Sequence, residues 1–223
     1  MKKHKGFTLS EILLALSIVG VLACMMVPMI ISNVQQNQFN FGVNQAYTML
    51  SQAILQIQYQ NGGIVNVTSG TSLASDLCNA MQCVQTGTSA SLYSPISNPF
   101  YYSTYKGSSF LSNIATDANP GVILSNGMYL FDIHTYASCV GTYGINACGN
   151  IGVDINGPYQ GPNMNGEDVY SFFVVLNNGV YSILPSGTAN DTVSGPGQTY
   201  SCKIGNWASG CTYQRLFYPN TMP

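Results

Sequence analysis

The sequence predicts an α+β protein in which one long N-terminal α-helix packs on a small antiparallel β-sheet. An apolar run near the N-terminus continues into a stripe of helical period that stops near residue 60. Further along, residues 122–131 and 170–184 each read as two apolar strands around an Asn-Gly turn, which is typical of β-hairpins. No internal repeat and no change of composition marks a second globular domain.

The first half of the helix has the length and composition of a membrane span. Residues 12–31 are twenty mostly apolar residues without a formal charge, and at about 1.5 Å per residue they cover the thickness of a bilayer core. Lys2, Lys3 and Lys5 precede this stretch, and no further basic residue follows before Lys106. By the positive-inside rule, we expect a cytoplasmic N-terminus and a globular domain on the opposite side of the membrane.

The second half of the helix is amphipathic, because apolar residues recur every three or four positions and glutamines occupy much of the remaining surface. We expect this half to pack on the globular domain and to end at Asn61-Gly62-Gly63, since glycine commonly terminates helices. The apolar stripe consists of Phe39, Val43, Tyr47, Leu50, Ile54 and Ile57.

The residues in front of the apolar run form a recognisable motif. Residues 5–11 read Lys-Gly-Phe-Thr-Leu-Ser-Glu, which resembles the cleavage and methylation motif of type IV pilins and type II secretion pseudopilins. The resemblance implies that a prepilin peptidase cuts after Gly6 and that the new amino terminus, Phe7, is N-methylated. It also implies that Glu11 pairs with the amino terminus of a neighbouring subunit, and that Pro28 lies where the family helix commonly bends or melts.

The resemblance implies three parts: a leader at 1–6, a transmembrane and assembly helix at 7–60, and a globular domain at 61–223. We expect a structural subunit of the minor class, inserted in the bacterial inner membrane. Its partners would be prepilin peptidase, other pilin or pseudopilin subunits and an inner-membrane assembly platform. Pilus and pseudopilus share this motif, so the sequence leaves that choice open. The alternative is a pilus-associated adhesin that binds a ligand through Tyr-, Ser- and Thr-rich loops.

Pro28 has two interpretations, because proline removes one helical hydrogen bond and clashes with the preceding turn. It either kinks the span permanently or marks a site where the helix extends during assembly. Within the globular domain we expect a short helix at 72–84 with Ser72 or Ser75 near its cap, and a strand at 151–155. Residues 85–120, rich in Ser, Thr, Tyr, Asn and Pro, read as a long surface loop or as an adhesive face.

Six of the seven cysteines form three pairs that are close in sequence, and the seventh, Cys24, lies in the apolar run. An even number in an exported domain indicates disulfides, for which six cysteines allow about fifteen connectivities. Proximity favours three local bonds. They would join Cys78 to Cys83, Cys139 to Cys148 and Cys202 to Cys211.

A loop at 154–168 concentrates oxygen-bearing side chains among glycines and prolines. Calcium takes six to eight oxygen ligands from such loops, whereas Asx turns alone also explain the composition. Both a calcium site and a purely structural loop therefore stay open. The candidate ligands are Asp154, Asn156, Asn163, Asn165 and Asp168, with Glu167 beside them.

The composition argues against two other classes of protein. Only two histidines are present, His4 in the leader and His134, and no nucleophile-elbow or phosphate-loop motif occurs, so we do not expect an enzyme. Charged residues make up 6% of the chain and no cluster of Lys or Arg follows the membrane span. Nucleic-acid binding needs such a cluster, and we expect none.

Overall fold

We describe the fold from a computed structural model of the chain. The structure describes residues 8–93, 105, 117–136, 138–139, 144–204 and 209–222. The predicted processing residues Gly6 and Phe7, and most of the predicted loop at 85–120, lie outside these ranges. The chain divides into two compact units, Met1–Gln38 and Phe39–Pro223.

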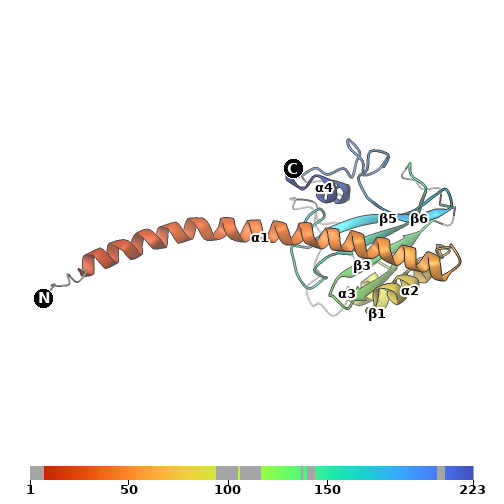
Figure 1. The fold of residues 1–223 in the computed structure, drawn as a ribbon, viewed down its shortest axis with the longest axis horizontal. Helices are drawn as coiled ribbons and strands as arrows, with labels where there is room; N and C mark the ends of the chain where they lie inside the picture. The colour runs from red at the N-terminus through yellow and green to blue at the C-terminus, as the bar shows by residue number, and fades with distance from the viewer. Residues whose placement is uncertain are drawn as a thin grey trace. The chain divides into compact units, whose positions relative to one another are not determined.

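The fold is a long helix, a six-stranded sheet and three further α-helices within the described residues. The strands form one antiparallel sheet in the order β1-β2-β3-β4-β5-β6, so each strand pairs with its neighbours along the chain. Figure 1 shows the outer part of α1 lying across this sheet. The elements are α1 (Leu9–Gln60), α2 (Gly70–Met81), β1 (Cys83–Thr88), α3 (Ser89–Tyr93), β2 (Pro120–Leu124), β3 (Tyr129–Thr135), β4 (Ala147–Asp154), β5 (Val169–Asn177), β6 (Val180–Pro185), α4 (Cys211–Phe217) and a 3-10 turn (Pro219–Thr221).

The outer half of α1 packs on one face of the sheet, as predicted. Its buried side chains follow the predicted stripe and join the main core with residues of α2 and of the sheet. Tyr47 stacks on Phe172 of β5, with ring centroids 6.3 Å apart. The α+β class, with a long N-terminal helix on an antiparallel sheet, is therefore confirmed.

Strand β5 separates two clusters of apolar side chains because successive residues of a strand point to opposite faces. Phe172 and Val174 belong to the core that includes α1. Phe173 and Val175 belong to a second cluster, on the face of the sheet that points away from α1. This second face carries the cavity described below.

The end of α1 ties the helix to the edge of the sheet. The helix stops at Gln60, and Gly62 and Gly63 follow with φ of 68° and 98°, as expected for a glycine stop. One turn before this end, the side-chain amide of Gln58 donates to the carbonyl of Tyr181 (2.8 Å) and accepts from its N–H (3.0 Å). A glutamine of α1 thus makes the hydrogen bonds that another strand would make with β6.

Two local predictions were wrong. The predicted short helix is present but runs from Gly70 to Met81 and not over 72–84. The hydroxyl of Ser69 accepts the N–H of Ser72 at 3.1 Å and caps the helix earlier, and residues 83 and 84 lie in β1. Residues 85–93 are not part of a loop, since they lie in β1 and α3. Strand β1 contains Gly, Thr and Gln and has a mostly exposed pattern, so it lacks the apolar alternation by which strands are recognised.

Candidate functional site

The start of α1 holds Glu11 in a defined orientation. The Oε2 atom of Glu11 accepts the backbone N–H and the hydroxyl of Thr8, each at 2.8 Å. The Thr8 hydroxyl oxygen lies 3.3 Å from the N–H of Glu11 and caps it. These reciprocal bonds are a capping box, which fixes the first turn of a helix. Thr8 was missed as a functional residue, although the spacing Thr8-Leu9-Ser10-Glu11 is itself the sequence signature of this box.

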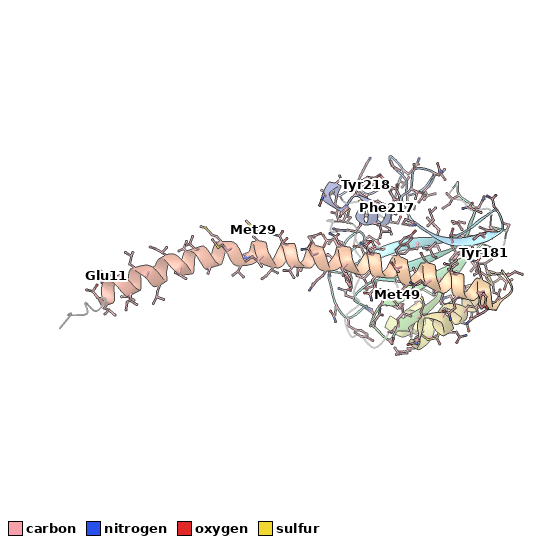
Figure 2. The ribbon with its side chains drawn as sticks, in the orientation of Figure 1. Glu11, Met29, Met49, Tyr181, Phe217 and Tyr218 are labelled. Atoms are coloured by element: carbon pink, nitrogen blue, oxygen red, sulfur yellow. A yellow bond between two sulfur atoms is a disulfide. The ribbon has the colours of Figure 1, made fainter. Side chains whose placement is uncertain are left out.

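The first half of α1 presents apolar side chains on all sides. Leu13, Met25 and Met29 are 56%, 68% and 68% exposed, and Met29 and Glu11 can be located in Figure 2. Within the described residues, α1 is the one helix that is long and apolar enough to cross a membrane, judged by length and composition. The helix continues without interruption through Pro28. An exposed apolar surface of this size is typical of sites that contact a membrane or other proteins.

Three disulfides connect the six cysteines of the globular unit: Cys78–Cys83, Cys139–Cys148 and Cys202–Cys211. These are the pairs favoured by their proximity in sequence. The first bond joins α2 to β1, the second joins the segment after β3 to β4, and the third fixes the first residue of α4. Cys24 is free and exposed on α1.

The loop between β4 and β5 is organised around Asp168, which is fully buried. Its Oδ2 accepts the N–H of Asn163 (2.8 Å) and the side-chain amide of Asn156 (3.3 Å), and its Oδ1 accepts the N–H of Met164 (2.7 Å). Burial outweighs these bonds and raises the pKa of Asp168 to about 6. The Oδ1 atom of Asp154, also buried, accepts the N–H groups of Asn156 and Gly157.

This loop fits calcium only in part. The side-chain oxygens of Asn156 and Asn163 are buried and have no hydrogen-bond partner among the residues that the structure describes, so both are suited to a hard cation. In contrast, the Asn156 amide directs its nitrogen at Asp168. The bridge of Asn165 with Val169 involves its backbone and not its side chain. Among the described residues, no three His, Cys, Asp or Glu side chains are grouped as metal ligands would be. Calcium binding at this loop stays a prediction.

The same loop is attached to both α1 and α4. Ile155 packs so closely on Gly42 of α1 that a Cβ at position 42 would lie 2.5 Å from the Cδ1 atom of Ile155. Arg215 of α4, which is buried, donates twice to the carbonyl of Gly166, at 2.7 and 3.2 Å. A third Arg215 nitrogen lies 3.3 Å from the side-chain oxygen of Asn40. The loop therefore sets how α4 and this part of α1 pack.

His134, the one histidine of the predicted mature chain, lies on β3 with an exposed side chain, next to the ring of Tyr136 (centroids 5.2 Å apart). The Asp132 carboxylate of the same strand is near enough to His134 to interact with it electrostatically.

Comparison with known proteins agrees with the N-terminal motif. Residues 1–27 match the family model for the prokaryotic N-terminal methylation motif. No curated protein and no solved structure shows a significant match to the chain. The matched segment includes Gly6, Phe7 and Glu11, and it supports the resemblance of this chain to type IV pilins and type II secretion pseudopilins.

Proposed function

We propose that this chain is a minor structural subunit of a type IV pilus or a type II secretion pseudopilus. Prepilin peptidase removes residues 1–6, α1 inserts in the inner membrane with its N-terminus in the cytoplasm, and the globular domain of residues 61–223 lies in the periplasm. An inner-membrane assembly platform then transfers the subunit into a fibre. The observation that carries this proposal is the match of residues 1–27 to the methylation motif, which runs into the apolar and exposed first half of α1.

The apolar surface of α1 explains why assembly has to proceed from lipid directly into a helical bundle. Each Å² of apolar surface moved into water costs about 25 cal/mol, and the span exposes apolar side chains around its whole circumference. A bundle of equivalent helices offers the same apolar surroundings as lipid. The fibre therefore gains the subunit without exposing this surface to water.

Glu11 gives the bundle its axial register. A carboxylate among apolar helices requires a partner of opposite charge, and cleavage after Gly6 creates one at the amino terminus of the neighbouring subunit. Thr8 holds the Oε2 atom of Glu11 at the helix start, so the carboxylate is oriented before the neighbour arrives. Loss of one partner from a buried ion pair costs roughly 3–5 kcal/mol.

The test replaces Glu11 and compares fibre incorporation with membrane insertion. Glu11→Leu should leave cleavage and insertion unchanged but reduce the amount of the subunit in sheared fibres by at least about 100-fold, which corresponds to about 3 kcal/mol. Ser17→Ala is the matched control, because the Ser17 hydroxyl bonds only the Leu13 carbonyl within the helix, and it should incorporate normally. Normal incorporation of Glu11→Leu would show that the pairing model is wrong.

Processing provides a second test. Mass spectrometry of the mature protein should find Phe7 as the first residue, carrying one additional methyl group. Gly6→Val should remain uncut, because bulk at the scissile position blocks the peptidase. Recovery of intact Met1 from cells with an active prepilin peptidase would refute the proposal.

Deletion of the gene separates the two kinds of fibre. Loss of surface fibres would assign the chain to a type IV pilus, and loss of an exported enzyme from the medium would assign it to a secretion pseudopilus.

A further inference from the structure

A cavity of about 460 Å³ opens beside the end of the sheet that carries the β5–β6 turn. Its lining comes from three separate segments: the residues before β4, the facing positions of β5 and β6, and the loop that follows β6. Val175 and Leu184 belong to the cluster on the face of the sheet that points away from α1. The cavity therefore belongs to that face, and its volume is within the range of small-molecule sites.

The lining combines an apolar floor with an amide rim. Val175, Leu184 and Ile145 supply apolar surface, whereas Asn146, Asn177 and Asn190 supply side-chain amides. None of the lining residues that the structure describes carries a charge. A ligand with a formal charge would lose its hydration here without gaining an ionic partner.

The side-chain amides of Asn146, Asn177 and Asn190 have donors and acceptors that are available to a ligand. Asn146 donates to the side-chain oxygen of Asn177 at 3.4 Å, which leaves the oxygen of Asn146 as an acceptor and the nitrogen of Asn177 as a donor. The side chain of Asn190 is exposed and makes no hydrogen bond within the described residues. Donors and acceptors thus occur side by side at Asn146 and Asn177, and Asn190 adds a third amide to the lining. Such a set suits hydroxyl groups, which both donate and accept.

The wall after β6 is rigid because a buried carboxylate organises it. Asp191 is 1% exposed, and its oxygens accept the N–H groups of Gly187 (3.0 Å), Val193 (3.0 Å) and Ser194 (2.8 Å). The N–H of Asp191 in turn donates to the carbonyl of Thr188 at 3.0 Å. The backbone at Thr188 and Asn190, which line the cavity, is therefore held in place before any ligand binds.

The opposite wall is fixed by a disulfide and by a close contact. Cys148, two residues beyond Asn146, is bonded to Cys139. Gly144 has φ of 68°, and a Cβ there would lie 2.5 Å from the Cγ2 atom of Thr192, so the two walls touch at this glycine. A preformed site loses little conformational entropy on binding, which favours small ligands with few contacts.

We propose that this cavity binds a neutral sugar, such as the terminal hexose or N-acetylhexosamine of a glycan. The amides of Asn146, Asn177 and Asn190 would bond the hydroxyls, and the C–H face of the ring would lie on Val175 and Leu184. This inference rests on the proposed function for its biological setting. A fibre with α1 at its centre turns the opposite face of the sheet, and hence the cavity, toward the exterior.

The test measures binding of free sugars to the full chain in phospholipid nanodiscs by saturation-transfer NMR. The probes are glucose, galactose, N-acetylglucosamine and N-acetylgalactosamine, with N-acetylneuraminic acid as the charged comparator. We expect at least one neutral sugar to bind with a Kd of about 1 mM and the charged sugar to bind at least about 10-fold more weakly. Absence of saturation transfer from all four neutral sugars would overturn the proposal.

Substitutions of the lining residues test whether the sugar binds in the cavity. Asn190→Ala removes an amide that bonds no other group in the described structure and should weaken binding about 3- to 10-fold. Asn79→Ala, on the exposed face of α2, is the matched control and should bind as the unchanged protein does. Unchanged affinity in both Asn190→Ala and a combined Asn146→Ala/Asn177→Ala protein would place the sugar elsewhere and overturn the proposal.

Measurement of fibre incorporation distinguishes a failure of the sugar site from a failure of the proposed structural role. The cavity variants should enter sheared fibres normally, since they leave α1 untouched. A chain that binds sugar but never enters fibres would refute the structural role alone, and a chain that enters fibres without binding sugar would refute the sugar site alone.

Discussion

Substitution of Gly42 by alanine should have opposite effects on stability in two backgrounds that differ only at Ile155. Alanine is favoured over glycine inside a helix by about 0.8–1 kcal/mol, so Gly42→Ala would stabilise α1 if the position were open. The position is not open, because the new Cβ would lie 2.5 Å from Cδ1 and 3.2 Å from both Cβ and Cγ1 of Ile155.

The contact with Cδ1 is too short for a real Cβ atom, and overpacking of this kind typically costs about 1–3 kcal/mol. We therefore expect Gly42→Ala to destabilise the unchanged protein by about 1 kcal/mol after the gain in helix propensity is included. In an Ile155→Ala background, Cδ1 and Cγ1 are absent and only the contact at 3.2 Å remains. There the same substitution should stabilise the protein by about 0.5–1 kcal/mol.

The assay is urea unfolding of the full chain in detergent, followed by circular dichroism. The four proteins form a double-mutant cycle, and the two effects above imply a coupling of about 2 kcal/mol between positions 42 and 155. A stabilising effect of Gly42→Ala in both backgrounds, or a coupling below about 0.5 kcal/mol, would show that α1 and the 154–168 loop do not meet as described.

Four further predictions concern the globular unit. Non-reducing peptide mapping of the exported protein should recover the three local disulfides, and free thiols at those six positions would contradict it. Gln58→Ala should lower the unfolding free energy by about 1–2 kcal/mol, because two hydrogen bonds to Tyr181 are lost, whereas the exposed Gln52 should tolerate the same change. Since burial raises the pKa of Asp168 from 3.8 to about 6, its folded form favours the proton. In the presence of a chelator, the unfolding free energy should therefore fall by up to about 3 kcal/mol between pH 4 and pH 7, and Asp168→Asn should remove this slope. Calcium should raise the midpoint of thermal unfolding at pH 7 if the loop binds it, and an unchanged midpoint would leave the loop a purely structural one.

Much of the architecture could be predicted because it depends on short-range patterns. The apolar stripe of α1 and the glycines after Gln60 predicted the extent and the end of the helix. The Asn-Gly turns predicted two of the hairpins, β2–β3 and β5–β6. The paired strands in each hairpin are neighbours in sequence, so their turns determine which residues meet. The N-terminal motif was readable for the same reason, since all its functional residues lie within one short segment.

The remaining features depend on contacts between distant segments. Arg215 looks like a surface residue in the sequence, and its burial becomes visible only when Gly166 and Asn40 lie beside it. Helix α4 has only seven residues, too few to show a helical period. The cavity combines residues around positions 145, 176 and 189, which no local pattern could have joined.

The bond between Gln58 and Tyr181 also bears on aggregation. An open edge of a sheet exposes unpaired N–H and C=O groups that can template pairing with another molecule, and subunits awaiting assembly would be crowded in one membrane. On β6, Gln58 already occupies the N–H and C=O of Tyr181, and Pro185 near the end of the strand has no N–H to offer. At Tyr181 and Pro185, a second copy that met this edge would therefore find no free backbone N–H with which to pair.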